Sequence, residues 1–293
     1  MAYVLVLVAT DPQRLLAAER RAEKELGGLT AWGPLGPAAA QTTIDSADAA
    51  ALNQALAIQL ADLPVDYCLT PDDPARRKRL LIADMDSTII GCECLDELAE
   101  FAGVKAEVSA ITERAMRGEI DFAGALRERV AMLEGLPSSD LQRCFDERVR
   151  LNPGARVLAA TMAERGARCV LVSGGFDFFT RRVAEAAGFQ AERANHLIEA
   201  DGRLTGQVRE PILGRAAKLA ALREEADARG LDLADTLAVG DGANDLAMIE
   251  AAGLGVAYRA KPVVAAQADA RIDHTDLTTL LYFQGYRAHE FQG

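Results

Sequence analysis

Three short apolar runs in this chain each stop abruptly at polar or small residues. The runs and the residues that end them are Leu80–Ala83 before Asp84, Cys169–Val172 before Ser173, and Leu237–Val239 before Gly240. Continuous apolar runs separated by helical stretches are typical of strands buried on both faces of a parallel sheet. Ligands in such sheets bind beyond the carboxyl ends of the strands, so the three polar clusters are expected to share one edge. The sequence therefore predicts an α/β core with its functional residues at that edge.

The first cluster places two carboxylates, Asp84 and Asp86, two residues apart at the end of a buried strand. In a chain leaving extended geometry, side chains two apart point the same way, so both can face one reacting group. Two close carboxylates repel each other unless a cation lies between them or one holds a proton. The pair favours a hard divalent cation, and Mg²⁺ above others, because Mg²⁺ prefers oxygen ligands. The alternative is a capping pair at a strand-to-loop exit.

The second cluster, Gly240 to Asp245, follows another predicted buried strand. Its glycines allow a tight turn and a close approach of the backbone. On its own the stretch is an ordinary turn signal. At the same sheet edge as Asp84 and Asp86, however, Asp241 becomes a third oxygen ligand for the cation. Asp245 would then hold metal-bound waters or orient a lysine.

The third cluster, Ser173-Gly174-Gly175, offers a hydroxyl and backbone N–H groups where a strand leads into a helix. Such a turn favours an anion such as phosphate, although in isolation a plain glycine-rich loop is the commoner reading. Lys218 lies in a helix with apolar periodicity and by itself would more often be a surface lysine. The order of the three clusters and Lys218 along the chain is what makes the set informative.

Taken together, these motifs resemble the phosphatase branch of the haloacid-dehalogenase superfamily over roughly residues 80–276, and in particular its members that act on phosphoserine. The resemblance implies a Rossmann-like parallel sheet with a helical cap inserted at about 94–150. It implies that Asp84 is the nucleophile and Asp86 the general acid and base. It also implies Mg²⁺ held by Asp84, Asp86 (through its carbonyl) and Asp241, with Asp245 behind them, and phosphate bound by Lys218, Ser173, Gly174 and Asn244.

Two charged residues of the predicted cap bear on the substrate. In the family an acidic residue seven positions after the second aspartate binds the substrate amino group, which here is Glu93. A cap-helix arginine binds the substrate carboxylate, and Arg129 aligns with it. Arg127, two residues earlier, would point off that face of the helix. Either charge alone is more often solvated, but the two together suit the head group of an amino acid.

The resemblance implies hydrolysis of O-phospho-L-serine to L-serine and phosphate through an aspartyl-phosphate, the last step of the phosphorylated route of serine biosynthesis. One alternative is a phosphotransferase that passes phosphate from phosphoserine to another alcohol. Another is a catalytically silent serine sensor. A dehalogenase on the same fold would lack the acid at Asp86. A P-loop kinase is excluded because its phosphate-binding motif does not occur in the sequence.

The first 75 residues are predicted to form a separate unit, and residues 76–293 the phosphatase domain. Strands and helices in the order β-α-β-β-α-β indicate a small α+β, ferredoxin-like domain, with its second strand, around Trp32 to Leu35, poorly defined. The unit resembles the ACT-type domain that precedes the catalytic domain in many bacterial family members. It is interpreted either as a packing or homodimerisation module or as a sensor that binds serine as an effector.

Composition excludes some classes of partner. The formal net charge of −12 argues against nucleic acid and anionic membranes, which need a positive surface. No apolar run approaches the roughly 18 residues of a membrane span. Five cysteines are odd in number and irregularly spaced, which favours reduced thiols in a soluble, cytoplasmic protein.

Overall fold

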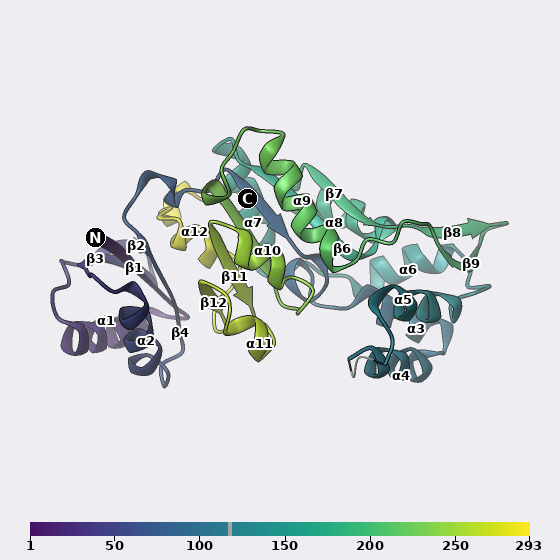
Figure 1. The fold of residues 1–293 in the computed structure, drawn as a ribbon, viewed down its shortest axis with the longest axis horizontal. Helices are drawn as coiled ribbons and strands as arrows, with labels where there is room; N and C mark the ends of the chain where they lie inside the picture. The colour runs from purple at the N-terminus through teal and green to yellow at the C-terminus, as the bar shows by residue number, and fades with distance from the viewer. Residues whose placement is uncertain (117–118) are drawn as a thin grey trace.

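The computed structural model describes residues 1–116 and 119–293 of the chain. It contains a small N-terminal domain, a central α/β core and a cap beyond one edge of that core (Figure 1). The predicted fold class is confirmed: a parallel sheet core carries an inserted, mainly helical cap and follows a small α+β unit. Among the described residues, no helix is long and apolar enough to cross a membrane. All five cysteines are free.

The N-terminal domain is a four-stranded antiparallel sheet in the order β2-β3-β1-β4, with two helices on one face. Its elements are β1 (Ala2–Ala9), α1 (Pro12–Leu26), β2 (Gly33–Gly36), β3 (Ala39–Asp45), α2 (Ala49–Gln59) and β4 (Val65–Pro71). Helix α1 begins where the Asp11 side chain accepts the N–H groups of Gln13 and Arg14. The strand that the sequence left poorly defined, around Trp32 to Leu35, corresponds to β2.

Strand β1 is buried on both faces because two cores meet on it. Leu5 and Leu7 pack with the helices of their own domain. Val4, Val6 and Val8 pack instead in the large core of the rest of the chain. The free face of the N-terminal sheet thus docks on the α/β core, and burying it removes apolar surface from water.

A buried carboxylate stabilises the same interface between the N-terminal domain and the core. Asp66 on β4 is 2% exposed and accepts backbone N–H groups from Asp273, His274 and Thr275 at distances of 2.8 to 3.3 Å. A buried charge that is fully hydrogen-bonded avoids the large penalty of an unpaired one. Arg76, after the linker, also contributes there, since it donates to Gln41 and to the Phe283 carbonyl.

The core is a six-stranded parallel sheet in the order β12-β11-β10-β5-β6-β7. Its strands are β5 (Leu80–Ala83), β6 (Arg168–Phe176), β7 (Ala191–Asn195), β10 (Thr236–Gly240), β11 (Leu254–Tyr258) and β12 (Ala270–Ile272). Its helices are α7 (Ala155–Glu164), α8 (Asp177–Ala187), α9 (Arg215–Asp227), α10 (Leu246–Ala251), α11 (Pro262–Ala265) and α12 (Thr279–Phe283). The three predicted apolar runs lie in β5, β6 and β10, which are adjacent in the sheet.

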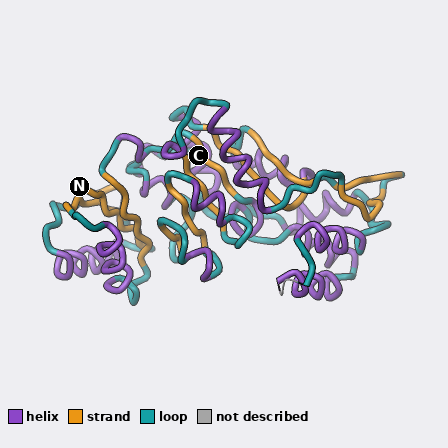
Figure 2. Tube along the Cα trace, in the orientation of Figure 1, coloured by secondary structure: helices purple, strands orange, loops and turns teal. Residues whose placement is uncertain are grey.

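Alternating residues of the central strand feed two separate cores. On β5, Leu81 and Ala83 pack with α7, α8 and α12, whereas Leu80 and Ile82 pack with α9, α10 and α11. This period of two produces a three-layer arrangement, with helices covering both faces of the sheet (Figure 2). Both faces of a central strand are therefore apolar, which is why the run reads as continuous in the sequence.

The cap consists of α3 (Cys94–Ala102), α4 (Lys105–Met116), α5 (Phe122–Ala131), α6 (Ser139–Arg148) and an antiparallel hairpin of β8 (Leu197–Ala200) and β9 (Arg203–Val208). The hairpin was not expected from the sequence. It projects from the core beside α5 and α6 (Figure 1), and Leu204 accepts and donates backbone hydrogen bonds with Gly135 and Leu136. Gly206 has a φ of +72°, and a side chain there would crowd Ala131 and Glu134.

Candidate active site

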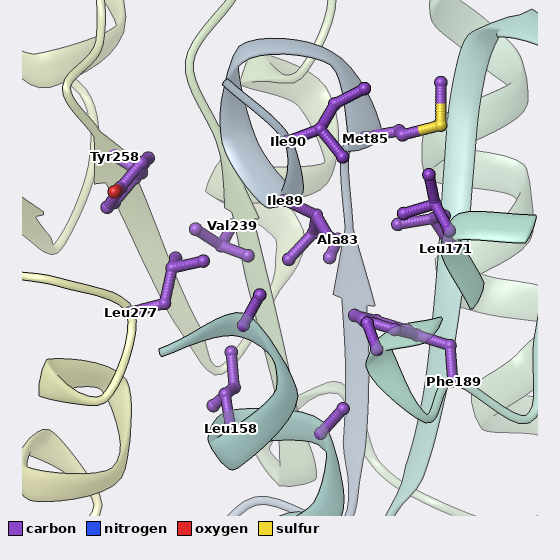
Figure 3. Close-up of a cluster of buried hydrophobic side chains, with 14 of the residues drawn as sticks. Ala83, Met85, Ile89, Ile90, Leu158, Leu171, Phe189, Val239, Tyr258 and Leu277 are labelled. Carbon is purple, nitrogen blue, oxygen red and sulfur yellow. The ribbon is translucent and has the colours of Figure 1, made fainter. Parts of the chain in front are cut away.

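The site starts at the carboxyl end of β5, where the chain enters the turn Met85–Ile89, in which Asp86 and Ser87 have non-helical backbone angles. The backbone N–H of Asp84 donates to the Val239 carbonyl of β10 at 3.0 Å, which extends the strand pairing to the site. Met85 and Ile89 are fully buried and anchor the turn in the core (Figure 3). Since close-packed side chains resist displacement, the turn holds Asp84 and Asp86 in fixed positions.

Asp86 receives hydrogen bonds on both carboxylate oxygens. The Cys94 N–H donates to Oδ1 at 3.0 Å, and the Ser173 hydroxyl donates to Oδ2 at 3.2 Å. Burial, followed by the negative charge of Glu93, nevertheless raises the pKa of Asp86 to about 6. Asp86 can therefore hold or release a proton close to neutral pH.

Beneath Asp84 lies a buried ion-pair network. Lys218 Nζ is 2.7 Å from Asp84 Oδ1 and 2.5 Å from Asp245 Oδ1, and all three side chains are at least nine-tenths buried. Burial lowers the pKa of Lys218, but the two carboxylates outweigh it and the net direction is upward. Burial and the Asp245 charge raise the pKa of Asp84 well above its usual range. Lys218 therefore stays protonated, and its one positive charge faces two carboxyl groups, those of Asp84 and Asp245.

Asp241, after β10, completes an acidic group. Carboxylate oxygens of Asp84, Asp241 and Asp245 lie within 4.8 Å of one another. Burial, then the charges of Asp245 and Glu93, raises the pKa of Asp241 to about 6, although Thr88 donates to it at 3.2 Å. Repelling, buried carboxylates of this kind are the donor set that hard divalent cations take in proteins. The side chain of Asp86 is not part of this group.

The carboxyl end of β6, which continues past the predicted apolar run to Phe176, brings Ser173 and Gly174 to the same edge. The Gly175 N–H donates to Ser173 Oγ at 2.8 Å, and a side chain at Gly175 would collide with Asp86 Oδ2. Only glycine allows this close approach. Asn195, which the sequence prediction missed, is 2% exposed and donates to the Gly174 carbonyl at 2.8 Å. The sequence signal was weak, because one asparagine at a strand end is ordinary.

A cavity of about 480 Å³ lies between the core and the cap. The predicted residues that line it are Asp84, Asp86, Glu93, Arg129, Ser173, Gly174, Asp241 and Asn244. Lys218 and Asp245 lie below its floor, where Lys218 contacts both Asp84 and Asp245. Residues that the sequence prediction missed also line the cavity, among them Phe122 of α5 and Lys261. Their distance in sequence from the motifs gave no reason to include them.

The cap supplies two charges of opposite sign to the cavity wall. Glu93 precedes α3, and Arg129 lies in the last turn of α5, where its Nε donates to the Ala125 carbonyl at 3.2 Å. Burial lowers the pKa of Arg129, and the charges of Asp96 and Glu93 act in the opposite direction. Arg127 does not line the cavity and pairs with Glu210 at 2.6 Å instead.

Comparison with known proteins gives one consistent result. The model of the haloacid dehalogenase-like hydrolase family matches residues 81–250. A phosphoserine phosphatase from Streptococcus thermophilus is 48% identical over 200 residues, which cover 68% of this chain and 93% of that protein. A HAD family hydrolase from Salmonella enterica has a TM-score of 0.87 and 28% identity, covering 96% of this chain and 98% of its own. A probable phosphoserine phosphatase from Vibrio cholerae has a TM-score of 0.80 and 31% identity, and the match covers 97% of this chain and 86% of that protein.

Proposed function

The chain belongs to the haloacid dehalogenase-like hydrolase family, and from that premise we propose that it hydrolyses O-phospho-L-serine to L-serine and phosphate. The observation that carries the substrate is the pair of opposite charges, Glu93 and Arg129, on the cap side of the cavity. An amino acid head group needs one anionic and one cationic contact. The phosphate end would then reach Asp84, on the core side of the same cavity.

In the proposed reaction Asp84 attacks the phosphorus atom in line. A bond forms between its carboxylate oxygen and phosphorus while the bond from phosphorus to the serine oxygen breaks. The aspartyl-phosphate divides one difficult displacement into two easier steps. Lys218, whose ammonium group contacts Asp84 at 2.7 Å, fixes the carboxylate and offsets charge on the phosphoryl oxygens. Ser173, the Gly174 N–H and Asn244 are assigned to those oxygens as donors.

Asp86 is assigned both proton transfers. As the acid it protonates the departing serine oxygen, and as the base it takes a proton from the water that opens the aspartyl-phosphate. A pKa of about 6 supports this dual role, because both protonation states are accessible near neutral pH. The hydrogen bond from the Cys94 N–H would hold the carboxyl group in place through both steps.

The acidic group fits a hard divalent cation, to which we assign Mg²⁺. Its proposed protein ligands are Asp84, Asp241 and the backbone carbonyl of Asp86. When bound, Mg²⁺ would supply Lewis-acid stabilisation and reduce the repulsion between the nucleophile and the phosphate. Asp245 shares the group, but its oxygens already contact Lys218 and the Gly242 N–H. Its assigned part is therefore to orient Lys218.

The proposed reaction predicts a narrow substrate profile. Purified protein with Mg²⁺ should release inorganic phosphate from phosphoserine much faster than from phosphothreonine or a sugar phosphate, since only phosphoserine satisfies both cap charges without extra bulk. A phosphate-release assay with and without Mg²⁺ measures this directly. A phosphorylated product formed from an added alcohol, in place of free phosphate, would favour the phosphotransferase alternative. Absence of turnover on every substrate would favour the silent serine sensor.

The charge of Glu93 should be visible in the titration of Asp86. Glu93→Gln removes a negative charge that raises the pKa of Asp86. The titration midpoint of Asp86 should therefore move from about 6 to a lower pH, so that a smaller fraction of Asp86 is protonated at pH 6. Carboxyl ¹³C NMR of the metal-free protein measures the midpoint, and Asp86→Asn identifies the resonance by removing it. An unchanged midpoint would contradict the electrostatic link between the two residues.

The remaining proposals concern the domains and the setting. We take residues 1–75 as an ACT-like domain that serves either as a packing or homodimerisation module or as a sensor that binds serine as an effector, and residues 76–293 as the phosphatase domain with its cap at about 94–150. The strand order β2-β3-β1-β4 supports the first assignment. We place the reaction at the last step of serine synthesis, and the five free thiols support a reducing, cytoplasmic location.

A further inference from the structure

Ser87 adopts a backbone conformation that residues with a side chain usually avoid. Its φ is +57° and its ψ is −3°, in the left-handed region that favours glycine. In the described part of the chain, Asp201 and Arg259 are the other non-glycine residues with positive φ. Residues in sparsely populated conformations gather at functional sites, where the surrounding structure holds them. The conformation of Ser87 therefore calls for a role of its side chain.

The Ser87 hydroxyl has a defined partner. Its Oγ donates to Oε1 of Glu93 at 2.7 Å, and the Ser87 N–H donates to the Cys92 carbonyl at 3.2 Å, which closes the loop between the two residues. Glu93 stands at the N-cap position of α3 but makes no side-chain capping bond there. The hydroxyl thus holds a glutamate whose exposed side chain would otherwise sample several rotamers.

The geometry separates this contact from the cavity itself. Among the described residues, the cavity wall includes Glu93 but not Ser87, so Ser87 would act on a substrate only through Glu93. The next residue, Thr88, donates its hydroxyl to Asp241 at 3.2 Å. The hydroxyls of two consecutive residues therefore contact two different acids, Glu93 and Asp241.

We propose that Ser87 is a positioning residue that sets selectivity for an amino group in the substrate, by fixing the carboxylate of Glu93 on the cavity wall. This proposal rests on the proposed function, because it assigns Glu93 to the substrate ammonium group. A carboxylate already held in place loses less conformational freedom when the ammonium group binds. Loss of the hydroxyl should weaken binding of the amine and leave the chemistry at Asp84 largely intact.

The test compares phosphoserine with 3-phosphoglycerate, which carries a hydroxyl group in place of the ammonium group. In Ser87→Ala, the KM for phosphoserine should rise on the order of tenfold, the effect expected for loss of a charged hydrogen bond. The kcat for phosphoserine and the KM for 3-phosphoglycerate should change far less. Ser87→Gly should show the same loss of selectivity although glycine accepts the positive φ, which separates the hydroxyl from backbone strain.

Two further variants sharpen the result. Ser87→Asn should recover part of the selectivity, because asparagine tolerates the left-handed region and its amide N–H can donate to Glu93. Thr88→Val is the matched control, since it removes the neighbouring hydroxyl. It should raise the Mg²⁺ concentration required and leave the ratio of the two substrates as in the wild type.

A double-mutant cycle and a structure separate the possible failures. Ser87→Ala combined with Glu93→Gln should be no less selective than Glu93→Gln alone. If the two losses multiply instead, or if Ser87→Ala slows both substrates equally, the proposal is wrong. A wild type without preference for phosphoserine would count against the proposed function. Crystal structures of the wild type and Ser87→Ala still test Ser87 in that case, and an unmoved Glu93 carboxylate would overturn its positioning role.

Discussion

Asp84→Asn is expected to abolish phosphatase turnover, with a loss on the order of 10⁴-fold or more. An amide oxygen is a poor nucleophile, and the neighbouring cavity carboxylates of Asp86 and Asp241 are assigned to proton transfer and to the metal. The substitution keeps the shape of the side chain, and Lys218 retains its 2.5 Å contact with Asp245. Phosphate release from phosphoserine measures the loss, and mass spectrometry of acid-quenched wild-type protein should detect a phosphoryl group on Asp84.

Asp86→Asn is the matched control for that experiment. It removes a neighbouring carboxylate of the same size, and its expected loss is smaller, on the order of 10²-fold, because it removes acid and base assistance and leaves the nucleophile. Near-normal turnover in Asp84→Asn would show that another group attacks phosphorus. Equal losses in the two variants would leave the division of roles between Asp84 and Asp86 without support.

Removal of the metal should abolish activity, and in Asp241→Asn added Mg²⁺ should no longer restore it. Chelation of the wild type with EDTA is expected to stop phosphate release, and added Mg²⁺ to restore it. In Asp241→Asn one of the proposed ligands is an amide, so Mg²⁺ should restore little activity. Calorimetric titration with Mg²⁺ measures the binding itself. Full activity of the wild type in excess EDTA would contradict the metal assignment.

The same variant makes a prediction about stability. The pKa of Asp241 is raised from its usual value of 3.8 to about 6 in the folded protein. Between these values the unfolded chain loses its proton while the folded protein keeps it, so stability falls as pH rises through that window. Above pH 6 the full cost remains, about 2–3 kcal/mol. Metal-free Asp241→Asn should therefore melt at a higher temperature than metal-free wild type at pH 7, and at a similar temperature near pH 4.

The melting experiment also reports on the metal. Mg²⁺ should raise the melting temperature of the wild type, because a ligand that binds only the folded state stabilises it. It should have little effect on Asp241→Asn. If the variant is less stable than the wild type at pH 7 without metal, then the carboxylate of Asp241 contributes to the fold and the assigned repulsion is wrong.

Much of the core was predictable because its signals are local. The apolar runs of β5, β6 and β10 are continuous in sequence, since each strand is covered by helices on both faces. In a parallel sheet their carboxyl ends must share an edge, so the chain alone indicated that Asp84, Ser173 and Asp241 lie near one another. The succession of strands and helices along the N-terminal unit, β-α-β-β-α-β, was likewise predicted and is confirmed.

The sequence did not reveal contacts that depend on long-range packing. Asn195, at the end of β7, contacts Gly174 at the carboxyl end of β6, and the hairpin of β8 and β9 joins the cap from a segment far beyond residue 150. Neither has a local pattern that distinguishes it from an ordinary strand end or turn. Such contacts arise because the chain returns to the same place after many residues, and periodicity within a short window carries no information about that return.

The identity of the acidic residues was thus determined by the sequence, whereas their charge states were decided by the tertiary structure. Asp84, Asp86 and Asp241 are visible as motif positions in the printed chain. Their raised pKa values depend on burial and on charges brought from Asp245 and Glu93. The contact of Ser87 with Glu93 likewise requires a left-handed residue within a closed loop. Electrostatic interactions depend on distance and on exclusion of water, and only the folded chain sets both.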